Sequence, residues 1–317
     1  MDSATSSAIQ VLSGVPQGSV LGPLLFLIYV DEVSSVHLSQ GSKLNLFADD
    51  LLLFKVISRL EDYAVTQDDI DAIADWSDDN HLVLNPAKCK CMVISRKKKL
   101  SCTAPQLLLN NHPLDQVDTF KYLGVLLSCD VSWSAHISAI CFKARQVIGH
   151  LYRKFYPMAN SDTLTHLYTT LVRPHLEYAC PVWAPYTRKD TELLESVQRF
   201  ACKMVTHCWS SSYEELLALT NLPTLEKRRL HLKLSHLYKI VHHQSFFPDG
   251  IVLLREHSQY NSRSVHALTL QQPFAHTQSY YYSFVPHTIS VWNTLPYEVS
   301  SSSSCAVFKR LLCCNNV

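Results

Sequence analysis

The sequence predicts an α+β fold, and two observations carry this prediction. Two short apolar runs within Lys43–Phe54 flank an Ala-Asp-Asp tip, which is typical of a β-hairpin that presents two carboxylates. From Trp133 onward, apolar residues recur at helical spacing with Lys and Arg between them. We therefore expect a small β region with packed helices, followed by a mostly helical second half.

Composition narrows the class of protein. The chain has 317 residues, 47% of them hydrophobic, which suffices for one large or two smaller cores. Its net charge of +1 is not that of a strongly basic nucleic-acid binder, so local patches must supply any phosphate affinity. The start has no basic and apolar leader, and no apolar run is long enough to span a bilayer. We expect an intracellular protein, in the nucleus or cytoplasm, not secreted and without a membrane segment.

The 11 cysteines are expected to be free thiols. Their spacing does not form paired CxxC knuckles, and the His242-His243 pair has no cysteine at zinc-finger distance. The sequence therefore predicts no structural zinc.

The tip of the predicted hairpin holds Asp49 and Asp50. Adjacent carboxylates repel each other by up to ~4 kcal/mol at an effective dielectric near 20, so a fold leaves them in water or binds a cation between them. Mg²⁺ takes carboxylate and phosphate oxygens together, as phosphoryl transfer requires. A solvated turn remains the alternative interpretation, because Asp is a common turn residue.

A glycine-rich loop precedes the hairpin. In Ser13–Ser19 (SGVPQGS), Pro16 restricts the residue before it to extended conformations and the glycines permit close backbone approach. A short apolar helix is expected from Ser19, a candidate N-cap, with Pro23 in its first turn. This loop, the apolar helix and then Phe-Ala-Asp-Asp between strands resemble the palm of reverse transcriptases. The closest match is to the non-LTR (LINE-like) retrotransposon branch.

The resemblance implies an RNA-directed DNA polymerase that adds deoxynucleoside triphosphates to a DNA primer on an RNA template. It implies that Asp49 and Asp50 are catalytic ligands of Mg²⁺. It also implies nucleotide and template contacts at Pro16, Gln17, Gly18, Phe47 and Ala48. Packing alone would explain a tight turn in this loop, although it does not explain Gln17 beside Gly18.

Two segments follow the hairpin. Glu61–Asn80 is predicted to be an amphipathic helix with its many aspartates on a solvated face. His81–Ser95 resembles the next palm segment, a loop carrying Asn-Pro-x-Lys and then an alternating strand. By resemblance, Lys88 is a catalytic residue that approaches the leaving pyrophosphate, where a cation neutralises charge. An ordinary solvated lysine in a turn is equally compatible with the sequence.

Two more hairpins are expected in the β region. Asn110-Asn111 is a turn signal between Leu107–Leu109 and Leu114–Val117. Phe120–Leu127 resembles the primer grip of the family, with primer contacts implied at Tyr122, Leu123 and Gly124.

The second half is predicted to be helical. Helices are expected over 136–156, 161–176, 190–208 and 225–243. By position they match the family's thumb, in which basic residues such as Lys227, Arg228 and Arg229 would bind phosphates without reading sequence. In the tail, Tyr280–Pro286 and Val291–Pro296 resemble the end of many non-LTR polyproteins. Their aromatics can stack on bases, although buried anchors are the favoured interpretation. A short closing helix is expected near Phe308.

We divide the chain into residues 1–100, a partial palm; 101–132, a primer-grip region; 133–245, a thumb-like region; and 246–317, an irregular tail. The resemblance starts near Ser13 and lacks the fingers and the palm strand with the first metal-binding aspartate. We therefore expect the isolated chain to be inactive, unless another chain supplies those parts or the natural product is longer. A non-catalytic nucleic-acid-binding or protein-binding module is the alternative function.

Overall fold

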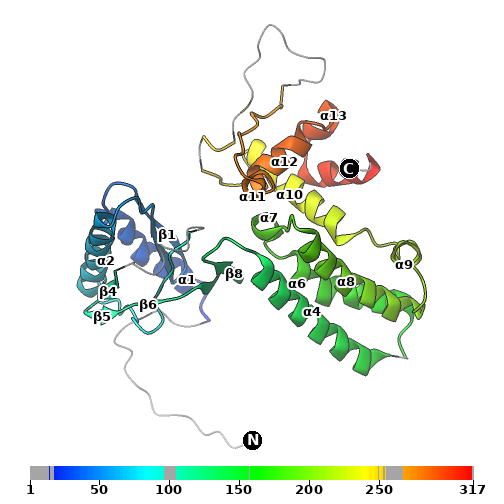
Figure 1. Cartoon of the computed structure of the whole chain (residues 1–317), viewed down its shortest axis with the longest axis horizontal. Helices are drawn as coiled ribbons and strands as arrows, with labels where there is room; N and C mark the ends of the chain where they lie inside the picture. Colours follow the sequence, from blue (N-terminus) through cyan, green and yellow to red (C-terminus); the bar gives the residue numbers. More distant parts are fainter. Residues whose placement is uncertain are drawn as a thin grey trace, which may run out of the picture. The chain divides into compact units, whose positions relative to one another are not determined.

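The computed structural model describes residues 14, 18–95, 105–156, 158–248, 250–252, 254 and 267–315 (Figure 1). Its contacts divide the chain into two compact units. Unit 1 comprises residues 1–120 and 129–131, and unit 2 comprises residues 121–128 and 132–317. Both units contain helices, and the strands within the described residues all lie between Ser42 and Ser128. The predicted α+β class is thus confirmed.

Unit 1 is built from short elements. They are α1 (Gly22–Val30), η1 (Asp31–Ser35), β1 (Ser42–Phe47), β2 (Asp50–Lys55), α2 (Glu61–Asp79), β3 (Lys90–Cys91), β4 (Leu108–Leu109), β5 (His112–Pro113) and β6 (Asp115–Gln116). Helix α1 begins three residues after Ser19, whose Oγ accepts a hydrogen bond from the Gly22 amide at 2.9 Å. Pro23 occupies its first turn, where a missing amide hydrogen costs nothing.

The β3–β6 and β4–β5 sheets of unit 1 pack against α2. The β4–β5 hairpin turns at Asn110 and Asn111, whose φ angles of 49° and 62° match a two-residue type I′ turn. A hairpin was predicted here, but its second strand is His112–Pro113 and not Leu114–Val117, because the two-residue turn ends at Asn111. Within Leu114–Val117, Asp115–Gln116 form β6, which pairs in parallel with β3. The core of this region consists of Ala74, Leu107, Leu109 and Leu114.

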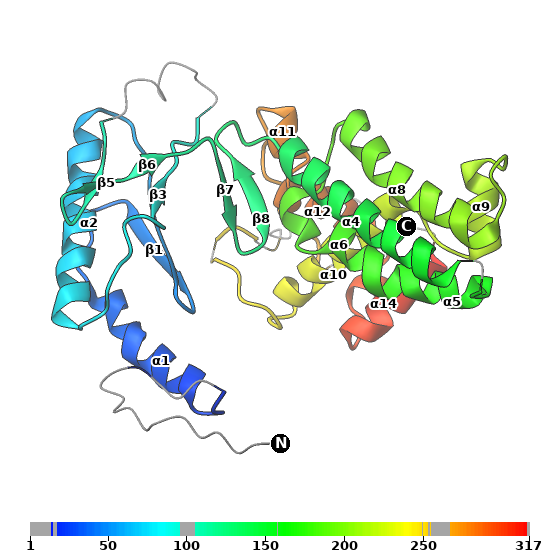
Figure 2. The ribbon, with the colours of Figure 1, turned by 90° about the horizontal axis from the view of Figure 1, so that it is seen from below.

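A further hairpin, β7 (Thr119–Tyr122) and β8 (Val125–Ser128), crosses the boundary between the units in the sequence (Figure 2). Its two-residue turn has positive φ at Leu123 (44°) and Gly124 (84°), as a type I′ turn requires. The predicted hairpin over Phe120–Leu127 is therefore present.

Unit 2 is helical. Its elements are α4 (Ser134–Phe155), α5 (Ser161–Leu167), the π-helical turn η2 (Tyr168–Val172), α6 (Arg173–Glu177), α7 (Cys180–Trp183), α8 (Arg188–Thr206), α9 (Tyr213–Thr220), α10 (Leu225–Val241), α11 (Gln278–Tyr281), α12 (Phe284–Trp292), α13 (Tyr297–Ser300) and α14 (Cys305–Cys314). Residues 161–176, predicted as one helix, are interrupted because Pro174 has no amide hydrogen to continue the ladder.

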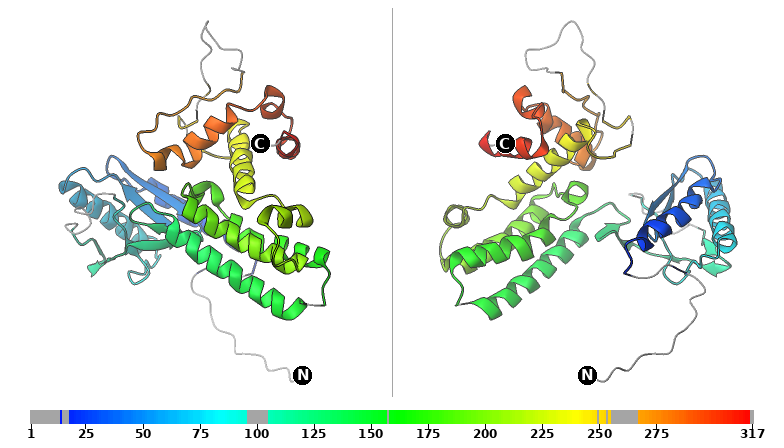
Figure 3. Two further views of the ribbon diagram at one scale, coloured as in Figure 1. Left: turned by 45° about the vertical axis from the view of Figure 1, so that its right-hand side comes forward. Right: turned by 180° about the vertical axis from the view of Figure 1, so that it is seen from behind.

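Two apolar cores hold unit 2 together. The first lies among α4 to α8 and encloses side chains such as Trp183, Leu176 and Tyr168. The second joins α10 to α12 and α14 around Trp292 and Phe308. Figure 3 shows α10 between the helices of the first core and the C-terminal helices, so one helix links both cores.

Two predictions about the tail had different outcomes. The closing helix near Phe308 is present as α14. Trp292 is fully buried, as the interpretation of the tail aromatics as buried anchors predicts. Tyr280, Tyr281 and Tyr282 are exposed, so the interpretation is wrong for these three rings, because Trp292 and Phe308 already fill the second core. The cysteines among the described residues are free thiols. In the part of the chain that the structure describes, no helix combines the length and apolarity needed to cross a membrane.

Candidate functional site

The candidate site is the tip of the β1–β2 hairpin. The strands pair antiparallel from Ser42 opposite Lys55 to Phe47 opposite Asp50, and Ala48-Asp49 form the two-residue turn. Ala48 has φ 53°, a left-handed conformation that usually falls to glycine. Such backbone strain is concentrated at functional sites in proteins. The structure confirms the position of the hairpin predicted from the sequence.

The two aspartates are exposed at this tip, as are Phe47 and Ala48. Phe47 and Asp50 lie directly opposite each other, so their side chains project from the same face of the ribbon. The ring of Phe47 keeps 61% of its surface exposed. The tip therefore combines carboxylate oxygens with an open aromatic surface.

The chemistry of the donors fits one kind of metal site. Mg²⁺ is usually held by one or two carboxylates together with substrate phosphates and water, not by a cage of protein ligands. Asp49 and Asp50 supply two such carboxylates, and within the described residues no group of three potential ligands forms. Neither aspartate has an ion-pair partner in that part of the chain. The residues fit Mg²⁺ that is shared with phosphates, and they do not form a complete site of their own.

The base of the hairpin is fixed by Asp69 of α2. Its carboxylate accepts hydrogen bonds from the Ser39 amide at 2.7 Å and from the hydroxyl of Ser42 in β1. Lys55 of β2 donates to the same hydroxyl at 3.0 Å. Burial would raise the pKa of Asp69, but the hydrogen bonds from Ser39 and Ser42 outweigh it and lower the pKa overall.

This anchoring role corrects the prediction that the aspartates of this helix form a solvated face, because Asp69 is buried. The burial of Asp69 could have been predicted from its position in the sequence. Asp69 lies four residues before Ile73, which is also buried, and such residues share one face of a helix.

The remaining predicted contacts of unit 1 are less well defined. Pro16 and Gln17 lie outside the described residues, and Gly18 has φ 79° with open space around it. Lys88 is exposed in a turn stabilised by Asn85, whose carbonyl accepts from the Lys88 amide at 3.0 Å. Among the hydrogen bonds and ion pairs of the described residues, none joins Lys88 to the hairpin tip.

Of the predicted primer contacts, Tyr122 ends β7, whereas Leu123 and Gly124 form the turn of the β7–β8 hairpin and contact Tyr178, the residue after α6. The hydroxyl of Tyr178 donates to the Leu123 carbonyl at 3.0 Å. A Cβ added at Gly124 would lie 3.0 Å from the ring of Tyr178. Tyr122, Leu123 and Gly124 belong to unit 2, whereas Asp49 and Asp50 belong to unit 1.

The basic residues at the start of α10 were expected to lie at the surface and bind phosphates. Two of them, Arg228 and Arg229, instead contact carboxylates of unit 2. Arg228 donates to both carboxylate oxygens of Glu177, with Nη2 at 2.8 Å from Oε2, and this hydrogen bonding raises the pKa of Arg228. Arg229 is buried and lies 3.8 Å from Glu195, and burial lowers its pKa. These two guanidinium groups serve packing and charge balance inside unit 2.

Comparison with known proteins shows which family this segment resembles. Residues 1–127, which include the β1–β2 hairpin, match the family described as reverse transcriptase (RNA-dependent DNA polymerase). The chain is also 29% identical over 215 residues to a probable RNA-directed DNA polymerase from transposon X-element of Drosophila melanogaster. This match covers 65% of the chain and 23% of the relative.

Two further relatives show the same pattern. The RNA-directed DNA polymerase from mobile element jockey of Drosophila funebris is 26% identical over 205 residues, which cover 62% of the chain and 22% of that protein. The retrovirus-related Pol polyprotein from type-1 retrotransposable element R1 2 of Nasonia vitripennis is 24% identical over 219 residues, 65% of the chain and 53% of that protein. These matches confirm the predicted resemblance to reverse transcriptases of non-LTR (LINE-like) retrotransposons. The chain spans about a quarter of the length of the first relatives.

Proposed function

We propose that this chain is part of an RNA-directed DNA polymerase of retrotransposon origin that acts in templated nucleotide addition. The observation that carries the proposal is the β1–β2 hairpin, which presents Asp49 and Asp50 at a strained turn within the segment that matches the family. In this proposal the hairpin and α2 form part of a palm, and the helices of unit 2 form a thumb-like region. The partners would be an RNA template, a DNA primer and deoxynucleoside triphosphates.

Each residue has a role in this scheme. Asp49 and Asp50 would hold Mg²⁺ together with the phosphates of the incoming nucleotide. Bound there, the ion would neutralise charge that develops on the transferred phosphoryl group. Phe47 and Ala48 would line the nucleotide, with the loop of Pro16, Gln17 and Gly18 as a further contact.

Two more elements complete the proposal. Lys88 would place positive charge at the leaving pyrophosphate. The turn of Tyr122, Leu123 and Gly124 would support the primer strand. Because the described residues offer only two adjacent carboxylates at the tip, we expect no primer extension by the purified chain alone, since two-metal transfer needs further ligands.

Binding of Mn²⁺, which takes the same oxygen ligands as Mg²⁺, tests the metal site. Free Mn²⁺ is measured by electron paramagnetic resonance with a deoxynucleoside triphosphate and the full chain. We expect weak joint binding that Asp49→Asn with Asp50→Asn abolishes. The matched control is Asp78→Asn with Asp79→Asn, a second exposed adjacent pair at the end of α2. Equal binding by both double variants would contradict the proposed site.

Primer extension on an RNA template tests the expected inactivity. The purified chain should give no product with Mg²⁺ and all four nucleotides. Robust extension that disappears in Asp49→Ala would show that the chain alone completes the catalytic site.

A further inference from the structure

A group of exposed aromatic rings lies where the loop before α8 meets the C-terminal tail. Tyr186 of that loop and Tyr282, which follows α11, stack with ring centroids 5.7 Å apart and planes 5° from parallel. Tyr281 stands edge-on to Tyr282 at 5.1 Å and 87°. We call Tyr186, Tyr281 and Tyr282 the tyrosine cluster.

These rings do not fill the core. They keep 39–45% of their surface exposed, whereas Trp183 and Trp292 in the neighbouring cores are fully buried. Aromatic rings that remain at the surface expose part of their π-faces to solvent, where another ring can stack on them. Tyr280, the preceding residue, is exposed as well.

The tyrosine cluster contacts the ring of His287, which is hydrogen-bonded to a buried lysine. The ring of His287 in α12 lies 5.6 Å from that of Tyr282, and its Nδ1 is 3.0 Å from Nζ of the buried Lys233 in α10. Burial, and then the charge of Lys233, lowers the pKa of His287 to about 4. At neutral pH His287 is therefore uncharged and accepts a hydrogen bond from the ammonium group. Lys233 of α10 is thus linked to the ring of Tyr282 through His287.

Two cationic residues follow Tyr186 closely in the sequence. Arg188 and Lys189 follow Tyr186 after one residue, at the start of α8, and both are exposed. The ion pair of Arg188 with Glu192 spans 3.5 Å between side chains that are 92% and 57% exposed, and such pairs contribute little. Phosphate can therefore replace Glu192 as the partner of Arg188.

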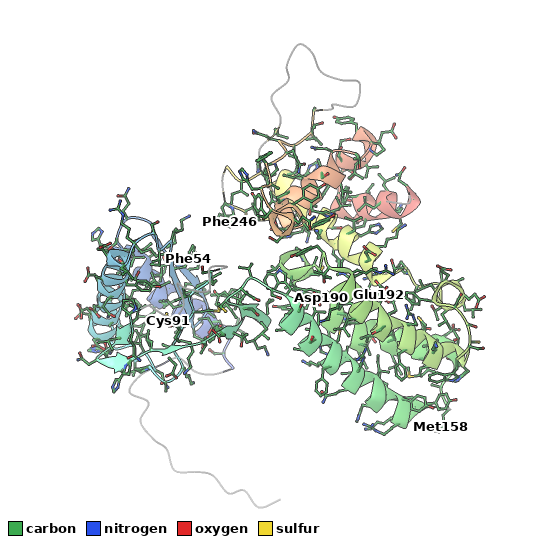
Figure 4. All side chains as sticks on the ribbon, in the orientation of Figure 1. Phe54, Cys91, Met158, Asp190, Glu192 and Phe246 are labelled. Carbon is green, nitrogen blue, oxygen red and sulfur yellow. The ribbon has the colours of Figure 1, made fainter. Side chains whose placement is uncertain are left out.

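The nearest acid of the same turn faces inward. Asp190 is buried and accepts hydrogen bonds from the hydroxyls of Ser134 and Thr187, both at 2.8 Å. Figure 4 labels Asp190 and Glu192 on α8. Because Asp190 is hydrogen-bonded inside the protein, it does not offset the charge of Arg188 and Lys189 at the surface. The exposed start of α8 therefore presents these two cations and the carboxylate of Glu192.

We propose that the tyrosine cluster with Arg188 and Lys189 binds single-stranded nucleic acid. Bases stack on the outer faces of the tyrosines and the two cations contact the phosphates. Proteins that bind single strands without sequence preference combine aromatic platforms with a positive track in this way. A proline-rich peptide also docks on exposed aromatics, but it would leave the flanking cations without a role. This binding needs neither the hairpin of unit 1 nor a metal ion, so it does not rest on the polymerase function.

The test is fluorescence anisotropy of the full chain with a labelled single-stranded oligonucleotide of ~15 nucleotides, as DNA and as RNA, in EDTA and without nucleotides. Tyr281→Ala with Tyr282→Ala should weaken binding at least about fivefold. Tyr281→Phe with Tyr282→Phe should retain the affinity, because the π-faces remain. Phe274→Ala removes an aromatic side chain of the same tail that is 79% exposed, and should change nothing.

A second variant keeps the proposal testable if the alanine variant unfolds. Arg188→Gln with Lys189→Gln changes only exposed side chains and should lower the slope of log affinity against log salt by about 2. An unchanged slope, or equal affinity of the alanine variant and the parent chain, would overturn the proposal. So would binding of a proline-rich peptide without any oligonucleotide binding. Asp49→Asn should leave this binding intact, so that failure here and failure of the metal site are distinguishable.

Discussion

The two units differ in how much of their apolar side-chain surface is buried. Unit 2 encloses two cores with many fully buried residues, among them Trp183, Trp292 and Phe308. In unit 1, helix α1 is apolar on every side, yet Leu24, Leu25 and other large side chains of it are about half exposed. The hairpin likewise exposes Phe47 and Phe54.

The large buried cores therefore lie in unit 2, whereas the candidate catalytic residues Asp49 and Asp50 lie in unit 1. Buried apolar area supplies most of the folding free energy, so unit 2 is expected to resist unfolding more than unit 1. The hairpin with Asp49 and Asp50 depends on a few polar contacts at its base. Substitutions in the two units should therefore have unequal effects.

A pair of matched leucine substitutions gives the largest expected contrast. Leu176→Ala removes a fully buried side chain of α6 and should lower the free energy of unfolding by about 2–5 kcal/mol. Leu24→Ala removes a side chain of α1 that is 54% exposed and should change it by less than about 0.5 kcal/mol. Native-state hydrogen exchange read by mass spectrometry measures each effect within its own unit. A large loss at Leu24 would show that α1 is buried in solution.

The next effect concerns the anchor of the hairpin. Asp69→Asn keeps the size of the side chain but removes the charge that accepts from Ser39 and Ser42. Hydrogen bonds to charged groups contribute about 1.5–3 kcal/mol, so we expect faster amide exchange in β1 and β2. Asp75→Asn, an exposed position on the same helix, is the control. Equal exchange in both variants would mean that the hairpin holds its shape without this contact.

A smaller effect is expected at the turn of the β7–β8 hairpin. Gly124→Ala places a Cβ at φ 84° and 3.0 Å from the ring of Tyr178, and should cost about 1–2 kcal/mol or more. Gly41→Ala has a similar φ of 87° but open space around it, so it reports backbone strain alone. Chemical denaturation of the two variants separates the strain from the contact. Equal losses would show that Tyr178 moves aside freely.

Much of the fold followed from local patterns. The alternation around Asp49, the paired turn residues Asn110-Asn111 and the helical spacing after Trp133 each depend on neighbours in sequence, and the structure contains the predicted elements. The helix α9 was missed, although Ser212 and Glu215 form a capping box that marks its start.

Features that depend on distant contacts were not predictable in the same way. Charge alone suggested that Asp69 and Arg229 are solvated, but each is buried against groups supplied by another element. The exposure of Tyr281 and Tyr282 depends on which residues fill the second core. The roles of Gln17 and Lys88 remain predictions from resemblance, since a role at a site depends on the partners around it.

The smallest expected effect is a pH dependence at α10 and α12 of unit 2. Burial lowers the pKa of His287 to about 4 from an ordinary value of 6.5, and lowers that of Lys233 to about 8 from 10.5. Between pH 4 and 6.5 the unfolded chain binds the extra proton at His287, so stability falls as the pH falls through this window. Between pH 8 and 10.5 the same reasoning for Lys233 makes stability rise with pH. Hydrogen exchange of α10 and α12 should follow both trends. His287→Leu should weaken the acid trend without abolishing it, because burial also lowers the pKa of His236 in α10. An acid loss of unchanged size in His287→Leu would assign the whole trend to other groups.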